Sequence, residues 1–114
     1  MRRSLSKREI VKKQSEINRA FKTGRKYSSH GLKLIVCPNE LKFSRIIVIP
    51  VKHYGNAVQR NRIRRQLREI WRCEKAHFVS GYDFVFLVYP GKTVEHLQQK
   101  KKLIDLCVEA GVYN

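Results

Sequence analysis

The sequence is poor in acidic residues and long hydrophobic runs, and each shortage excludes a class of protein. Among 114 residues, 9 acidic side chains stand against 25 lysines and arginines, a formal net charge of +16. Such a surplus repels itself unless an anionic partner neutralises it. No apolar run approaches the ~20 residues of a membrane-spanning helix, and Met1–Arg3 precedes polar residues rather than a signal-peptide core. We therefore expect a cytoplasmic protein with a nucleic-acid partner and no membrane.

Residues for catalysis or metal binding are also scarce. Cys37, Cys73 and Cys107 stand far apart, with no Cys-x-x-Cys pair and no ligand spacing to histidine. This pattern predicts reduced cytosolic thiols rather than a disulfide framework or a zinc site. The glycines form no Walker or dinucleotide loop. We predict no catalytic residue, no metal site and no cofactor bound by the protein alone.

Residues 55–69 hold five arginines within nine positions and still keep an apolar seam. Asn56 is a suitable N-cap for a helix that runs to about residues 72–77. With Ile63 at zero and ~100° per residue, Leu67 and Ile70 fall on the same side. A solvated helix face has no need of such a seam, whereas a helix docked on a core and facing RNA does. The candidate RNA-binding residues on this segment are Asn56, Arg60, Asn61, Arg62, Arg64, Arg65 and Arg68.

Hydrophobic periodicity and turn residues predict the first elements. A helix over 13–23 is expected to end at Gly24 in a left-handed conformation. Two Ile- and Val-rich strands, 32–37 and 44–51, flank the turn residues Pro38-Asn39-Glu40 and predict an antiparallel hairpin. Because 44–51 is almost continuously apolar, we expect it to be central in the sheet, with Pro50 near its end.

The second half of the chain predicts one more strand and one more helix. Asp83–Tyr89 is the strand, and Thr93 caps a final helix that ends before Gly111. The apolar stripe expected on this helix consists of Val94, Leu97, Ile104 and Val108. The order of elements predicts an α+β fold in two layers. We expect one domain over 1–114, with 1–10 a basic, flexible extension.

A second binding surface is expected between the first helix and the sheet. Ile17 and Phe21 share one helix face, and Lys33 and Ile35 alternate with Leu32 along the next strand. An apolar floor with basic edges suits single-stranded nucleic acid. The same residues fit a closed core equally well, and the pattern alone leaves both interpretations open.

Residues 55–69 closely resemble the signature of the bacterial ribonuclease P protein family. In that family a Gly-Asn-Ala-Val turn leads into Arg-Asn-Arg and a basic helix that ends in Leu-Arg-Glu. Phe21-Lys22-x-Gly24, Val51-Lys52-His53 and Asp83–Val88 extend the resemblance to about residues 11–108. It implies a two-layer αβββαβα sandwich, similar to some ribosomal proteins, with a small mixed sheet. It also implies a left-handed crossover, although right-handed crossovers are the general rule.

The resemblance implies a subunit of an endoribonuclease that removes the 5′ leader from precursor tRNA. Cleavage would be performed by the RNA subunit with Mg²⁺ in the holoenzyme, and the protein would be monomeric without RNA. By position, Lys52 and His53 would join the arginines in contacting that RNA. The cleft for the precursor tRNA leader would be lined by Ile17, Phe21, Leu32, Lys33 and Ile35.

Two other functions stay open from the sequence. One is a ribosomal or other structural RNA-binding protein, against which the Asn56 and Arg60-Asn61-Arg62 arrangement argues. The other is a stand-alone ribonuclease with His30 or His53 as acid and base.

Overall fold

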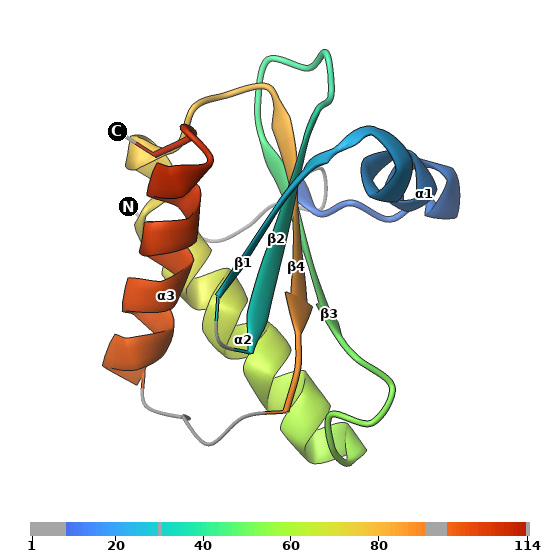
Figure 1. The fold of residues 1–114 in the computed structure, drawn as a ribbon, viewed down its shortest axis with the longest axis vertical. Helices are drawn as coiled ribbons and strands as arrows, with labels where there is room; N and C mark the ends of the chain where they lie inside the picture. Colours follow the sequence, from blue (N-terminus) through green and yellow to red (C-terminus); the bar gives the residue numbers. More distant parts are fainter. Residues whose placement is uncertain (1–8, 30, 91–95, 114) are drawn as a thin grey trace.

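In the computed structural model, residues 9–29, 31–90 and 96–113 are described, and they form two helical layers around one sheet (Figure 1). The four strands lie in the order β1-β2-β4-β3. Helices α2 and α3 cover one face of the sheet, and α1 lies on the other (Figure 1). The expected α+β fold is confirmed. The elements are α1 (Gln14–Thr23), β1 (Arg25–Ser29), β2 (Leu32–Pro38), β3 (Arg45–Pro50), α2 (Ala57–Cys73), the 3₁₀ helix η2 (Lys75–His77), β4 (Tyr82–Val88) and α3 (His96–Glu109).

The strand pairing differs from the expected hairpin. β2 does not pair with β3, because β4 lies between them, antiparallel to β2 and parallel to β3. β3 is therefore an edge strand and not central as expected. Its Ile46 and Val48 pack in the core under α2, whereas Ile47 and Ile49 lie on the α1 side. The connection from β3 through α2 to β4 is the left-handed crossover that the resemblance implies (Figure 1). Pro50 closes β3, as expected for a residue that cannot donate to a strand ladder.

The core between the sheet and α2 with α3 is closed. Ile63, Leu67 and Ile70 of α2 pack on it and are at most 4% exposed. The ring of Trp71 stacks on Phe78 with the centroids 5.5 Å apart. The helix begins with a capping box in which Asn56 Oδ1 accepts from Gln59 N–H and Gln59 Oε1 accepts from Asn56 N–H. The predicted two-sided helix is thus confirmed.

The stripe predicted for α3 is wrong. Val108 is 55% exposed and Ile104 is only partly buried, whereas Leu103, Leu106 and Cys107 are buried. The buried positions shift by about one residue because α3 packs against both α2 and the β1–β2 side of the sheet. Thr93 and Val94 lie outside the described residues, as does the side chain of Leu97.

Two further expectations about the first part of the chain need correction. Gly24 has φ −72°, which is not left-handed. A Cβ there would lie 2.5 Å from both Ala20 O and Ile35 Cγ2, so glycine is needed for the close approach of α1 to β2. Glu9 and Ile10 do not belong to a free extension, because Glu9 is buried and Ile10 bridges to Ile46 of β3. Residues 1–8 lie outside the described part. No helix among the described residues is long and apolar enough to span a bilayer.

Candidate nucleic-acid interface

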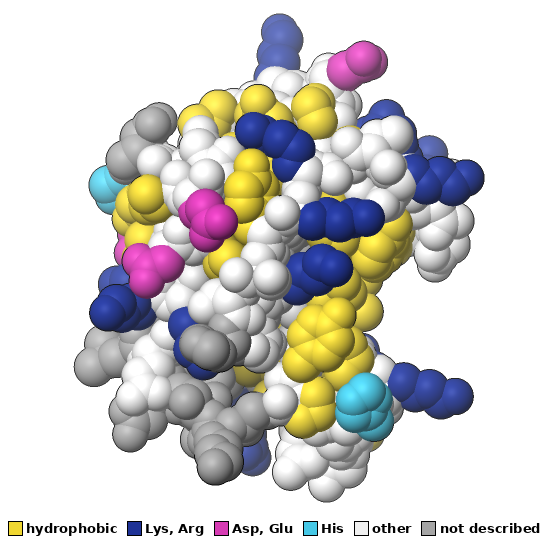
Figure 2. All heavy atoms as spheres, viewed as in Figure 1, with side chains coloured by type: hydrophobic (Ala, Val, Ile, Leu, Met, Phe, Trp, Pro, Cys, Tyr) yellow, Lys and Arg dark blue, Asp and Glu magenta, His cyan; other side chains and the backbone are white. Residues whose placement is uncertain are grey.

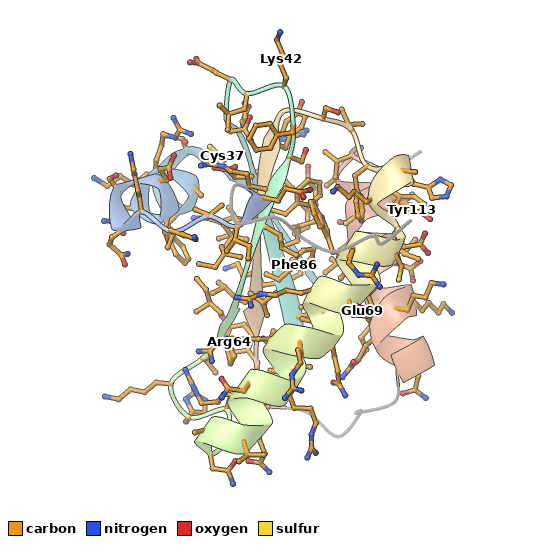
Figure 3. All side chains as sticks on the ribbon, turned by 180° about the vertical axis from the view of Figure 1, so that it is seen from behind. Cys37, Lys42, Arg64, Glu69, Phe86 and Tyr113 are labelled. Carbon is orange, nitrogen blue, oxygen red and sulfur yellow. The ribbon has the colours of Figure 1, made fainter. Side chains whose placement is uncertain are left out.

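One side of α2 is buried against the core. The arginines lie on the three other sides, which are the outer surface and the two flanks. Arg60, Arg64 and Arg68 follow one another at four-residue spacing and so share one flank. Arg64 lies toward β3 and Glu69 toward α3 (Figure 3). Glu69 is the one acidic residue of the helix, and it pairs with Arg72. The outer surface and the β3-side flank therefore carry almost unopposed positive charge.

The structure gives these arginines different roles. Arg60 donates to the carbonyl oxygens of Val51 and Pro50, the latter at 3.1 Å, so its guanidinium ties the end of β3 to the start of α2. Arg64 donates to Asn61 Oδ1 at 2.8 Å on the helix surface. Arg68 is partly buried, and its Nε has no hydrogen-bond partner.

The most accessible candidates are Asn61, Arg62 and Arg65, all of which are exposed. Within the described ranges, no carboxylate forms an ion pair with Arg62 or Arg65. Lys52 and His53 are exposed in the turn between β3 and α2 and so border the start of the same helix. Asn56 is also exposed, although its side chain is engaged in the capping box.

A second surface lies beside α1 on the opposite face of the sheet. We call it the α1-side surface and define it by Phe21, Lys33, Ile47, Ile49 and Leu87, all only partly buried. In the register of the sheet, Lys33 lies opposite Leu87 and Leu87 opposite Ile49, so the three form one row. In Figure 2, Lys and Arg side chains gather over the strands and α1, beside a hydrophobic strip, while acidic side chains lie over α3 and at the top of the view. This face offers apolar area edged by positive charge.

The predicted cleft residues do not all reach this surface. Ile17 of α1 is 8% exposed, and Ile35 is fully buried in the cluster on the α1 face of the sheet, so neither offers an accessible surface. Leu32 points the other way, into the core with α2 and α3, because side chains alternate along β2 and Lys33 takes the α1 side. The sequence did not indicate that Ile47, Ile49 and Leu87 belong to this surface. The alternating burial of β3 explains them, but the sequence alone did not place β3 beside β4.

A buried ion network closes one end of the α1-side surface. Arg45 of β3 donates to Asp83 through Nε at 2.8 Å and through Nη2 at 2.7 Å. Its Nη2 also donates to Glu16 of α1 at 2.9 Å. The hydrogen bonds with Asp83 raise the pKa of Arg45 above its usual value despite partial burial. Arg45 therefore joins α1 to the sheet and is not a free cation for RNA.

The histidines and cysteines of the described residues are spread over the fold. The described part of the chain contains no group of three His, Cys, Asp or Glu side chains able to hold a metal ion. His30 lies outside the described part, and His53 is exposed. The three cysteines are free thiols, and burial raises the pKa of Cys107 to about 12.

Comparison with known proteins agrees with this arrangement. The family model described as Ribonuclease P matches residues 5–111. A "Ribonuclease P protein component" of Petrotoga mobilis is 36% identical over 108 residues, covering 90% of this chain and 92% of the relative. The structure of the Staphylococcus aureus RNase P protein superposes with a TM-score of 0.84 at 29% identity, covering 93% of this chain and 98% of that one. A mutant of the S. aureus protein "with defective mRNA degradation activity" superposes with a TM-score of 0.84 at 25% identity, covering 94% of this chain and 92% of that one.

Proposed function

The chain belongs to the ribonuclease P protein family, and we propose that it binds the catalytic RNA subunit through α2 and the 5′ leader of precursor tRNA on its α1-side surface. As a ribonuclease P component it is a subunit of a ribonuclease whose partner is the ribonuclease P RNA. The observation that carries the RNA contact is the arginine set of α2, whose one acidic residue, Glu69, is already paired with Arg72. Arginine forks suit phosphate oxygens and stack on bases.

The leader is assigned to the α1-side surface because a single strand needs stacking area together with backbone neutralisation. Phe21 supplies an aromatic ring, and Ile49 and Leu87 supply apolar area beside it. Lys33 of the same row supplies a cation. Flexible, unpaired nucleotides fit this combination better than a duplex, whose bases are stacked inside.

Mg²⁺ belongs to the RNA in this proposal. The described residues contain no group of three His, Cys, Asp or Glu side chains that could hold the ion, and the proposal places the catalytic step on the RNA. The protein would hold and orient the two RNAs, neutralise phosphate repulsion and thereby lower the Mg²⁺ concentration that cleavage requires. We also propose that the protein is monomeric before it binds RNA and that it works in the cytoplasm. Three free thiols are compatible with that reducing compartment.

A reconstitution tests the proposal. Protein alone, RNA subunit alone and the two together would each receive a precursor tRNA at low Mg²⁺, with cleavage followed on a gel. We expect efficient removal of the leader from the mixture only. Lack of enhancement on mixing would favour a structural RNA-binding protein instead.

Cleavage by protein alone would overturn the assignment of chemistry to RNA. That arm matters because the similar S. aureus mutant is described as defective in an mRNA degradation activity. The same arm run with His53→Ala and His30→Ala proteins identifies whether either imidazole takes part.

A further inference from the structure

A cavity of about 340 Å³ lies between the first turns of α2 and the start of α3. Three glutamines line it: Gln59 and Gln66 from α2 and Gln99 from α3. Ile63 and Tyr54 add an apolar wall, and Arg62 stands beside them. Its volume lies within the range of about 300–1,000 Å³ that is usual for sites enclosing small ligands. The cavity faces away from the arginine flank of Arg60, Arg64 and Arg68.

Gln99 indicates that the cavity is built for a ligand. Its side chain is 8% exposed, and its Oε1 is buried without a hydrogen-bond partner. Buried polar groups in native proteins are nearly always satisfied, and an unsatisfied one calls for an explanation. Because the Gln99 side chain lines the cavity, a rotation of its carboxamide would present Oε1 to a ligand there, and a hydrogen-bond donor on that ligand would supply the missing partner.

The lining chemistry matches a nucleobase better than a phosphate alone. A carboxamide carries a donor and an acceptor side by side, which is the pattern on the edges of the bases. The partly buried ring of Tyr54 offers a flat apolar area for a base plane, beside the buried Ile63. Among the described residues that line the cavity, Arg62 is the one cation, and it is exposed and so can reach a phosphate outside the base site.

We propose that this cavity receives one unstacked nucleotide of the RNA partner, with its base against Gln99 and its phosphate at Arg62. The proposal rests on the RNA-binding function proposed above and adds a site of base recognition to it. α2 then contacts RNA in two ways: its arginine flank and outer surface bind phosphates without regard to sequence, and its α3-side flank binds one base.

The free protein provides a direct test by nitrogen-edited NMR of the glutamine side-chain amides. Adenosine, guanosine, cytidine and uridine would be titrated separately to their solubility limits, with inorganic phosphate as a parallel titration. We expect at least one nucleoside to shift the amide signals of Gln99 and of Gln59 or Gln66. A response to phosphate alone, or to no nucleoside, overturns the proposal.

Gln99→Leu replaces the carboxamide with an apolar side chain of similar size. Because Oε1 has no partner in the free protein, the melting temperature should stay unchanged or rise. The nucleoside-induced shifts of Gln59 and Gln66 should disappear. Gln98→Leu, at the exposed neighbouring position on α3, is the matched control and should leave them intact.

Binding to the RNA subunit separates this proposal from the general RNA-binding function. Gln99→Leu should weaken binding about tenfold, the usual size of one base contact, without changing its salt dependence. Arg65→Ala should weaken binding and also lower the salt slope. An effect of Arg65→Ala without one of Gln99→Leu refutes the base site alone, whereas no effect of either refutes RNA binding by α2.

Discussion

The two faces of the sheet consist of similar residues but are covered to different extents. On the face under α2 and α3, Leu34, Phe84 and Phe86 are completely buried. On the other face Ile49 and Leu87 stay partly exposed. α1 has 10 residues and is about 15 Å long, whereas α2 has 17 and α3 has 14. One short helix cannot cover four strands, so one face stabilises the fold and the other keeps apolar area for a ligand.

The side chains in Figure 3 illustrate the same contrast. Phe86 lies between the sheet and α2, and Cys37 lies on the side of α1. The comparison can be tested with pairs of substitutions that differ mainly in the face they affect.

The largest expected difference is between two leucines on opposite faces. Leu67→Ala, at a position 2% exposed, should lower the free energy of unfolding by about 3–4 kcal/mol because it leaves a cavity in a closed core. Leu87→Ala, at a partly exposed position, should cost about 1 kcal/mol. Urea unfolding followed by circular dichroism measures both. Equal losses would mean that the two faces contribute alike.

The next effect concerns the ion network that joins α1 to the sheet. Arg45→Met should lower the free energy of unfolding by about 3 kcal/mol, since the buried Asp83 loses its charged partner. Glu16→Gln removes only the outer, more exposed carboxylate and should cost at most about 1 kcal/mol. If the two variants melt together, Arg45 acts mainly through Glu16 and the assignment to Asp83 is wrong.

A smaller effect, on binding rather than folding, is expected for Arg65→Ala. It should weaken RNA-subunit binding about tenfold and reduce the salt slope by roughly one phosphate contact, without loss of stability. Arg72→Ala on the same helix is the matched control, because Arg72 already pairs with Glu69. Filter binding at several salt concentrations measures both. An equal loss for the two variants would show that helix charge, and not the exposed surface, determines affinity.

The α1-side surface is tested by Phe21→Ala. It should reduce affinity for a precursor tRNA with a leader about fivefold, through lost stacking. Affinity for mature tRNA and for the RNA subunit should not change. Fluorescence anisotropy measures the two tRNA affinities with the assembled holoenzyme and the affinity for the RNA subunit with the free protein. A uniform loss across all of them would indicate damage to the fold instead.

The smallest perturbation is to label the native thiols. Cys73 is exposed and should react with iodoacetamide at once, whereas Cys37 and Cys107 are buried. Cys37 packs on the α1 face and Cys107 in the core under α3. If the α1 side opens more readily, Cys37 should react before Cys107. Burial also raises the pKa of Cys107 to about 12, so mass spectrometry should find it labelled last. The reverse order would contradict the comparison.

Local pattern predicted the helices better than the sheet. α1 was expected over 13–23 and spans Gln14–Thr23, and α2 begins after Asn56 as its capping residues indicate. The predicted hairpin was wrong because nothing near residues 38–44 shows that a strand forty residues later inserts between β2 and β3. The sequence predicts a glycine requirement at residue 24, but for a left-handed turn. The structure shows that the requirement comes from the close approach to Ile35.

The candidate site divides in the same way. The exposed Arg62 and Arg65 were predictable from helical spacing. Arg60 lay in the same sequence run, yet its guanidinium is engaged by the backbone of Pro50 and Val51. Leu32 was assigned to the cleft, but the alternation of β2 directs it to the opposite core.

By itself, the sequence determined that α2 is buried on one side and cationic on the rest, because spacing and capping act within one helix. It also determined the family and the kind of partner, through the 55–69 run and the charge surplus. Only the tertiary structure decided which strands are neighbours, which arginines stay free, and that Gln99 meets Gln59 and Gln66 at a cavity. Those features depend on contacts between residues far apart in the chain, and no local pattern encodes them.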